Sequence, residues 1–158
     1  MIYCGQEVKM MIDYDNAISI TPYKELHDGD ESIHKHTQDG YAVPNKVIIY
    51  LQTTVPFMMS PGIYNHPFKI GTRLWGPYWY TDGKYYWDRD TWKYVLKYNL
   101  VLPQDFIDHV MSDEGTLFLE KCAKDNNSWG RVIEKWKEEP NSICLLPENA
   151  GDIDLDDF

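Results

Sequence analysis

The pair Asp82-Gly83, with an aromatic run on either side, constrains the fold of this chain more than any other feature. Glycine tolerates the positive φ angles of a tight turn, and an aspartate side chain can hydrogen-bond the nearby backbone. The flanking aromatic runs favour extended structure, because large rings pack well on a pleated surface. The sequence therefore predicts a β-hairpin with strands at 73–80 and 84–88, and Pro77 indicates a bulge or an edge position in the first strand.

Two helices are predicted to follow this hairpin. Asp88 or Asp90 can begin the first helix, over residues 89–98, because a carboxylate can accept hydrogen bonds from the free N–H groups of a helix start. Asn99 can adopt the left-handed conformation that ends a helix. Pro103 suits the start of the second helix, since the first helical position needs no N–H donor.

Outside this central stretch, the helical spacing of apolar residues predicts further helices over 44–53, from about residue 113 onward, and over 128–138. Lys46 is expected to face solvent on the first of them. Residues 55–72 combine three prolines and two glycines with apolar side chains. This composition predicts a buried or half-buried loop without regular structure.

The length and composition fit one globular domain. The chain has 158 residues, of which 43% are hydrophobic and 25% are charged, and both fractions are ordinary for a soluble domain. The predicted fold class is α+β, with a small antiparallel sheet that includes the 73–88 hairpin and is packed by four or five helices. The domain is predicted to span residues 1–147, and residues 148–158 to form an acidic, mobile tail.

The charge predicts the kind of partner. The formal net charge is −10, and residues 148–158 carry five of the 25 acidic residues and no basic one. Phosphate backbones would be repelled, so nucleic acid is not an expected partner. A protein with a basic surface would be attracted over long range, which would speed the encounter.

The cysteines and the first residues predict a cytoplasmic location. Three widely spaced cysteines are typical of a reduced chain and not of a disulfide framework; they are Cys4, Cys122 and Cys144. The opening run MIYCGQEVKM lacks the basic start and apolar segment of a secretory signal. The longest apolar run is also far shorter than a membrane span, so no membrane association is expected.

The aromatic residues around the hairpin allow two interpretations. Residues 75–98 hold ten of the 23 aromatic residues of the chain. They could all belong to the core, where rings supply large apolar areas. Alternatively, because successive side chains of a strand point to opposite faces, one aromatic face could stay exposed and bind a sugar, a base or a protein.

The sequence predicts no catalytic centre, metal or cofactor. His27, His34 and His36 lie among acidic residues, but their spacing matches no common zinc site. Asp88 and Asp90 could form the pair of carboxyl groups that hydrolyses a glycosidic bond. Helix capping, however, already explains at least one of these two residues.

The central stretch is similar to a segment of small, acidic bacterial proteins that are largely uncharacterised, some of which resemble the immunity partners of secreted toxins. The similarity rests on an Asp-Gly turn, an aromatic-x-Trp run, an aspartate before a helix, and the pairs Lys-Tyr, Leu-Pro and Phe-Ile. These are Asp82-Gly83, Tyr85 to Trp87, Asp88, Lys97-Tyr98, Leu102-Pro103 and Phe106-Ile107. The resemblance implies a shared fold unit and a toxin-neutralising role, and it assigns no site residue.

The favoured function is a non-catalytic, acidic binding protein, in particular an immunity-type inhibitor of a bacterial toxin. An acidic surface would attract a basic protein, and aromatic anchors would hold it. A carbohydrate-binding or carbohydrate-active protein that uses Asp88 and Asp90, and a structural or regulatory interaction module, remain as alternatives. The predicted binding residues are Trp75, Trp79, Tyr80, Asp82, Tyr85 and Asp88.

Overall fold

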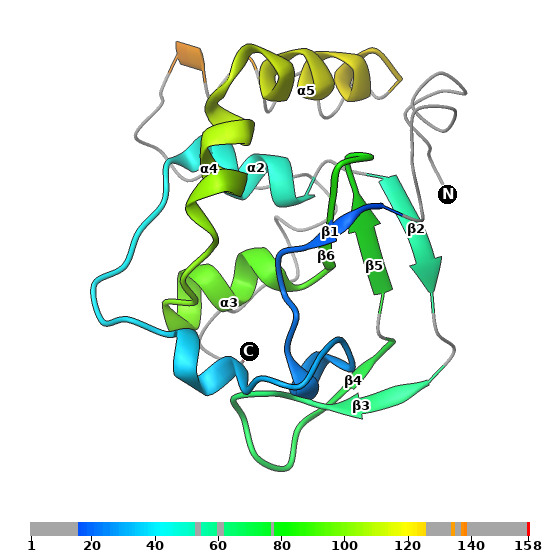
Figure 1. Cartoon of the computed structure of the whole chain (residues 1–158), viewed down its shortest axis with the longest axis vertical. Helices are drawn as coiled ribbons and strands as arrows, with labels where there is room; N and C mark the ends of the chain where they lie inside the picture. The colour runs from blue at the N-terminus through cyan, green and yellow to red at the C-terminus, as the bar shows by residue number, and fades with distance from the viewer. Residues whose placement is uncertain are drawn as a thin grey trace.

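The computed structural model describes the middle of the chain and a few later residues. The described parts are residues 16–52, 55–59, 62–76 and 78–125, with Glu134, Lys137, Glu138 and Phe158. The helix predicted over 128–138 and the predicted tail lie almost entirely outside these residues. In the described residues, a sheet and several helices surround one core (Figure 1).

The main sheet has four strands in the order β1-β6-β5-β2. These strands are β1 (Ile18–Ser19), β2 (Val55–Met59), β5 (Tyr78–Thr81) and β6 (Tyr85–Asp88). The pairs β2–β5 and β5–β6 are antiparallel, whereas the two-residue β1 joins β6 in parallel. A separate two-stranded antiparallel sheet consists of β3 (Ile63–Asn65) and β4 (Arg73–Trp75).

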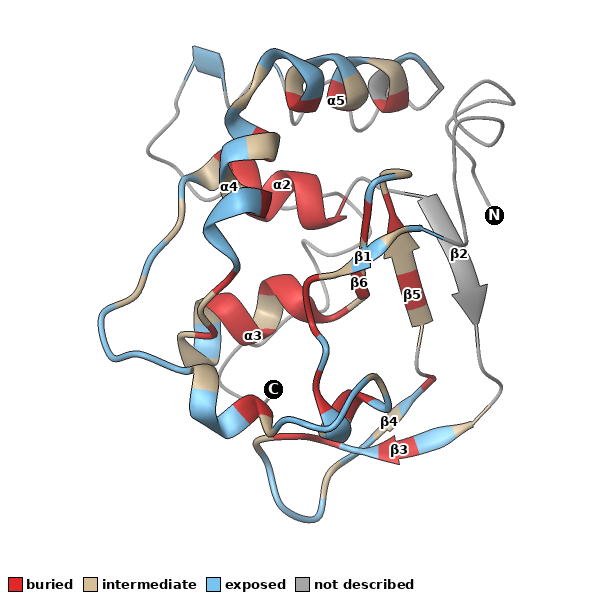
Figure 2. Ribbon diagram, viewed as in Figure 1, coloured by how far each residue is buried: buried red, intermediate tan, exposed pale blue. Residues whose placement is uncertain are grey.

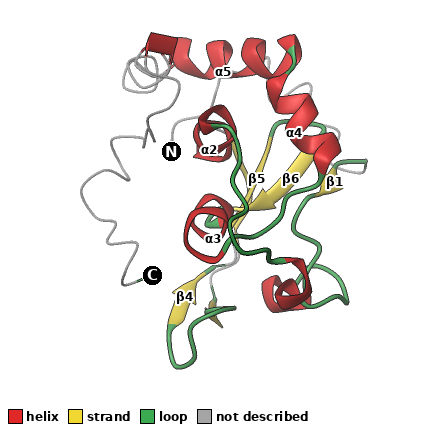
Figure 3. Ribbon diagram, turned by 90° about the vertical axis from the view of Figure 1, so that its left-hand side faces the viewer, coloured by secondary structure: helices red, strands yellow, loops and turns green. Residues whose placement is uncertain are grey.

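Four α-helices lie within the described residues, together with two 3₁₀ turns. The helices are α2 (Asn45–Gln52), α3 (Thr91–Tyr98), α4 (Gln104–Met111) and α5 (Asp113–Asp125), and the turns are η1 (Lys24–Leu26) and η2 (Ile33–His36). Figure 3 shows α2 and α3 on one side of the β5–β6 hairpin, while α5 lies across the end of the molecule. This arrangement is the predicted α+β class.

The predicted hairpin is confirmed, but its first strand is shorter than expected. The chain turns at Gly76, whose φ of 124° is open to glycine and rarely to other residues. Residues before this turn leave the main sheet and pair with β3 instead, so that Trp75 lies opposite Ile63. The aromatic stretch is therefore divided between two hairpins, β5–β6 and β3–β4.

The predicted helix at 89–98 is confirmed as α3. Asn99 ends it in the left-handed conformation, with φ of 56°, and its N–H donates to the carbonyl of Tyr94. Asp90 stands at the N-cap position, but its side chain makes no capping hydrogen bond. Asp88 Oδ1 accepts a hydrogen bond from the Asp90 N–H at 2.8 Å, so the side chain of Asp88 holds the turn before the helix.

Two predictions for the middle of the chain are wrong. The segment 55–72 is not an irregular loop, because it contains β2 and β3. Pro56 fits into β2 at an irregularity of the register, a position where a missing N–H is tolerated. Lys46 does not face solvent: it is 3% exposed, and its ammonium donates to Thr116 Oγ1 of α5 at 2.7 Å.

The core lies between the hairpin and the helices, and every residue of α2 after Asn45 is buried (Figure 2). Its largest fully buried side chains include Trp87, Tyr50, Tyr94 and Phe106. The Tyr50 and Trp87 rings each lie within 6.0 Å of the Phe106 ring, so α2, β6 and α4 meet there. Burial of such rings contributes about 2 kcal/mol or more each.

Candidate functional site

The structure separates the six predicted binding residues. Trp79, Tyr85 and Asp88 are buried, at 6%, 7% and 1% exposure, and cannot contact a partner in this structure. Tyr80 is half-buried. Asp82 is a half-buried residue whose side chain is only 1% exposed. Trp75 alone of the six is largely exposed, at 67%.

The buried members belong to the β5–β6 hairpin because both of its faces are covered. Trp87 is completely buried, and its indole N–H donates to the carbonyl of Leu51 at 3.2 Å. On the other face, the Trp79 ring meets Tyr86 edge to face at 5.8 Å. The interpretation of these rings as core is correct for this hairpin.

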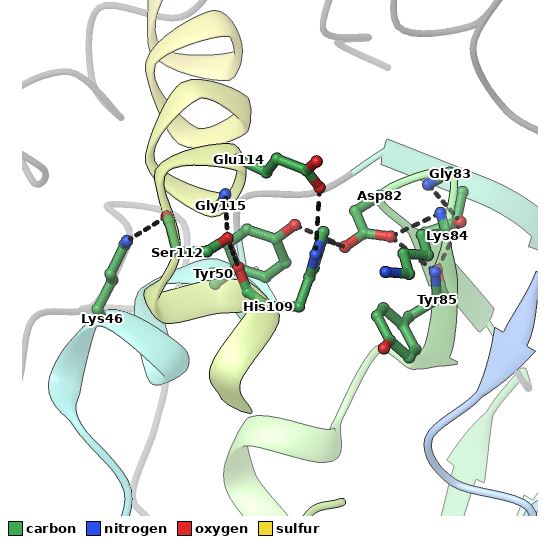
Figure 4. A network of polar contacts seen from close by, with 11 residues as sticks. Lys46, Tyr50, Asp82, Gly83, Lys84, Tyr85, His109, Ser112, Glu114 and Gly115 are labelled. Atoms are coloured by element: carbon green, nitrogen blue, oxygen red, sulfur yellow. Dashed lines mark hydrogen bonds and ion pairs between the residues drawn. The ribbon is translucent and has the colours of Figure 1, made fainter. Parts of the chain in front are cut away.

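Asp82 is the centre of a polar network at the hairpin turn (Figure 4). Its Oδ1 accepts hydrogen bonds from the backbone N–H groups of Lys84 and Tyr85 at 2.9 and 2.8 Å, which fixes the turn. Its Oδ2 accepts from the Tyr50 hydroxyl at 2.6 Å and lies 3.2 Å from His109 Nε2. The carboxylate thus connects the turn to α2 and α4.

His109 continues the network to α5. Its Nδ1 lies 3.6 Å from Glu114 Oε2, while its Nε2 faces Asp82. Each ring nitrogen therefore faces a carboxylate, one from the hairpin turn and one from α5. The ring is largely buried, with 12% of its side chain exposed, whereas the side chain of Glu114 is 79% exposed.

The network sets the ionisation of Asp82 and Tyr50. Burial raises the pKa of Asp82, but the hydrogen bonds from His109, Tyr50 and the turn backbone outweigh it, so the pKa lies below its usual value. Burial, followed by the nearby Asp82 charge, raises the pKa of Tyr50 well above its usual value. Tyr50 is therefore a stable donor to an ionised carboxylate.

The polar groups of this network are engaged with one another. Sequence analysis selected Asp82 and missed Tyr50 and His109, since neither lies in a motif or near Asp82 in the sequence. All four hydrogen-bonding positions of the Asp82 carboxylate are used by the protein itself. The network primarily holds together the turn, α2, α4 and α5.

A second carboxylate cluster lies at the other end of β6. Burial, with the neighbouring Asp90, raises the pKa of Asp88 to about 8. Asp90 lies 3.1 Å from Lys93 Nζ and 3.6 Å from Arg89 Nη2. Both aspartates are buried, at 1% and 2% exposure, so a glycosidic bond has no access to them. This burial disfavours the predicted carbohydrate-active alternative.

The β3–β4 hairpin carries the largest exposed aromatic side chain of the described residues. Trp75 is paired across the strands with Ile63, which is 53% exposed. Asn65 and Arg73 form the next cross-strand pair and are exposed on the same face. We call these four residues the hairpin face.

A pocket of about 520 Å³ adjoins the hairpin face. Three residues of the face, Ile63, Asn65 and Arg73, line it from the hairpin. Lys24 and Glu25 of η1 line it too, as does His27, the residue that follows η1. The hairpin face is therefore hollowed on one side. The hollow carries Lys24 and Arg73 together with one carboxylate, that of Glu25, which accepts hydrogen bonds from the Ser32 hydroxyl and the Ile33 N–H.

The histidines predicted as a loose cluster do not converge. His36 Nε2 pairs with Glu31 at 2.7 Å, the His34 ring packs on Phe68, and His27 packs on Tyr64. Among the residues the structure describes, no group of three or more histidine, cysteine or acidic side chains could hold a metal ion.

Phe158, at the end of the predicted tail, packs against the body of the molecule. Its ring centroid lies 4.5 Å from that of His66, and the Lys93 ammonium lies 4.8 Å from the Phe158 centroid. The Tyr98 hydroxyl donates to the Phe158 carbonyl at 2.7 Å.

Cys122 is buried and disulfide-bonded, so the prediction of reduced cysteines is wrong for this residue. Its partner lies outside the described residues, because the other two cysteines do. Sequence spacing could not show which thiols meet in the fold. Within the described part of the chain, no helix is both long and apolar enough to cross a bilayer.

Comparisons with known proteins identify no relative: no family model, no curated protein and no solved structure matches this chain.

Proposed function

We propose that this chain is a non-catalytic binding protein that holds a protein partner on the hairpin face, in particular as an immunity-type inhibitor of a bacterial toxin. The observation that carries the proposal is the exposed pair of Trp75 and Ile63. Tryptophan is among the residues that most often dominate binding energy at protein interfaces. An exposed ring beside an exposed aliphatic side chain forms a compact apolar anchor.

Charge supports a protein partner and suggests its chemistry. The net charge of −10 would attract a partner with a basic surface over long range. At the hairpin face itself the charge is mixed, because Arg73 and Lys24 line the adjoining pocket together with Glu25. A partner that is basic overall, with one acidic side chain opposite Arg73, would satisfy both conditions.

A carbohydrate-binding role is the second candidate, and it would use the same face without Asp88 and Asp90. The observation in its favour is the exposed Trp75 ring beside polar Asn65 and Arg73 and the adjoining pocket. A glycan-array screen with the full chain separates the two functions. Glycan binding that is lost in Trp75→Ala would favour this candidate.

Affinity capture with the immobilised full chain tests the proposal. Extract from the source cells is passed over wild type, Trp75→Ala and Met111→Ala, at low and at high salt. Met111 is a matched control because it is 46% exposed on α4, away from the hairpin face. We expect a partner on wild type and Met111→Ala, weaker binding at high salt, and loss on Trp75→Ala. Equal capture by Trp75→Ala would refute the proposal.

The cellular compartment of the protein is part of the same proposal. The number of cysteines predicts a cytoplasmic chain, whereas the disulfide at Cys122 is typical of an oxidising compartment. Counting alkylated thiols by mass spectrometry in protein isolated from its source cells distinguishes the two. Three free thiols would indicate the cytoplasm, and one would indicate an oxidising compartment.

A further inference from the structure

A second pocket lies at the turn of the β5–β6 hairpin. Figure 1 shows this turn far from β3–β4. It has a volume of about 340 Å³, and we call it the turn pocket. Tyr50, Asp82 and His109 line it, so the polar network of Figure 4 borders the cavity. This pocket is independent of the hairpin face and of the function proposed there.

On the side of the turn pocket formed by the network, the hydrogen-bonding groups already have partners within the protein. The Asp82 carboxylate accepts from Tyr50 and from two turn N–H groups, and it faces His109. A ligand therefore gains little by hydrogen bonding to Asp82. Because four elements meet in this network, it gives the pocket a rigid, preformed wall, which is the usual property of small-molecule sites.

The α5 side of the turn pocket is apolar. Leu117 lines the pocket although it is 54% exposed, and the half-buried Phe118 lines it beside Leu117. The Phe118 ring lies 5.5 Å from the Tyr50 ring. An apolar group in the pocket would remove this surface from water, at about 25 cal/mol per Å² buried.

Two ammonium groups that line the turn pocket are available to pair with an anion. Lys84 and Lys121 both line it, and neither forms an ion pair with a described residue. The Lys84 ammonium lies 5.6 Å from the centroid of the Tyr85 ring. The only other exposed charge of the lining is Glu114, whose Oε2 lies 3.6 Å from His109 Nδ1.

We propose that the turn pocket binds a small carboxylic acid with an apolar body. The carboxylate would pair with Lys84 and Lys121, and the apolar body would lie against Leu117 and Phe118. The volume is near the lower end of the range for small-molecule pockets, which is ample for an acid of the size of an acylated amino acid.

An NMR titration of the full chain tests this assignment with three related probes. N-acetyl-leucine carries only the carboxylate, leucinamide carries only the ammonium, and leucine carries both. We expect saturable shifts at Leu117 and Phe118 with N-acetyl-leucine, and none with leucinamide. If the ammonium of leucine contacts Glu114, leucine should bind at least as well as N-acetyl-leucine. The Glu114→Gln substitution should then remove this gain in affinity.

The two lysines are tested by charge removal. Lys121→Gln should weaken N-acetyl-leucine binding about threefold, as expected for one exposed charge pair. The double variant with Lys84→Gln should weaken it about tenfold, as expected for the loss of two such pairs. Lys124→Gln is the matched control, because Lys124 is exposed on the same helix and does not line the pocket.

Three results would overturn the assignment. They are the lack of saturable binding of N-acetyl-leucine, binding of leucinamide with equal affinity, and an unchanged affinity in the double lysine variant. None of them bears on the hairpin face, so failure here leaves the protein-binding proposal untouched.

Discussion

The two aromatic hairpins of this molecule have similar side chains and opposite environments. In β5–β6, Trp79, Tyr85 and Trp87 are buried and belong to the core cluster. In β3–β4, Trp75 and Ile63 stay in contact with solvent. Ring content alone therefore does not mark a binding surface; what covers the strand decides whether a ring stabilises the fold or is free to bind.

The difference follows from the position of each hairpin. β5 and β6 are the central strands of the main sheet, with neighbours on both edges. β3 and β4 pair only with each other among the described strands, and one of their faces packs inward through Tyr64 and Leu74. Substitutions in β5–β6 should therefore change stability, and substitutions on the hairpin face should change binding.

The largest expected effect is that of Trp87→Ala in β6. It removes the largest fully buried side chain and leaves the Leu51 carbonyl without its indole donor. We expect the free energy of unfolding to fall by about 4 kcal/mol, the usual size for a large aromatic side chain in a core. Chemical denaturation followed by circular dichroism measures it. A loss as small as that of a surface substitution would contradict the contrast between the hairpins.

Asp82→Ala should have the next largest effect, about 3 kcal/mol, because it leaves Tyr50 and His109 without their buried partner. Since the pKa of Asp82 is lowered in the fold, its contribution is present above its ordinary pKa and disappears as the pH falls through the lowered value. Denaturation of wild type and Asp82→Ala as a function of pH should give curves that converge in acid. A constant difference would show that the charge does not matter.

Asp88→Asn, at the other end of the same strand, should act in the opposite direction. The pKa of Asp88 rises from 3.8 to about 8 on folding, so wild-type stability should fall as the pH rises between these values. The asparagine variant lacks this slope and should be more stable by about 1–2 kcal/mol near neutral pH. Parallel pH profiles for the two proteins would show that Asp88 is ionised in the fold.

Local signals in the sequence predicted local structure well. The Asp82-Gly83 turn, the β5–β6 hairpin and the end of α3 at Asn99 all depend on residues close together in the chain. Contacts between distant residues could not be predicted. Lys46 is buried because α5 brings Thr116 to its ammonium, and Asp82 is part of a network only because α2 and α4 deliver Tyr50 and His109.

The binding surface also could not be predicted from local sequence signals. Six residues were predicted to bind, and five of them lie wholly or partly within the fold. Whether Trp75 or Trp79 would be exposed depended on the turn at Gly76, after which the strands belong to different sheets. The pairing of Trp75 with Ile63 could not be seen, because residues 55–72 were predicted as a loop.

The most direct test of the central claim pairs two measurements on Trp75→Ala. Its free energy of unfolding should stay within about 0.5 kcal/mol of wild type, as for other surface substitutions. Its affinity for the captured partner, measured by titration calorimetry, should fall at least tenfold, as for a residue that anchors an interface. Unchanged affinity in a variant of unchanged stability would show that the hairpin face is not the binding surface.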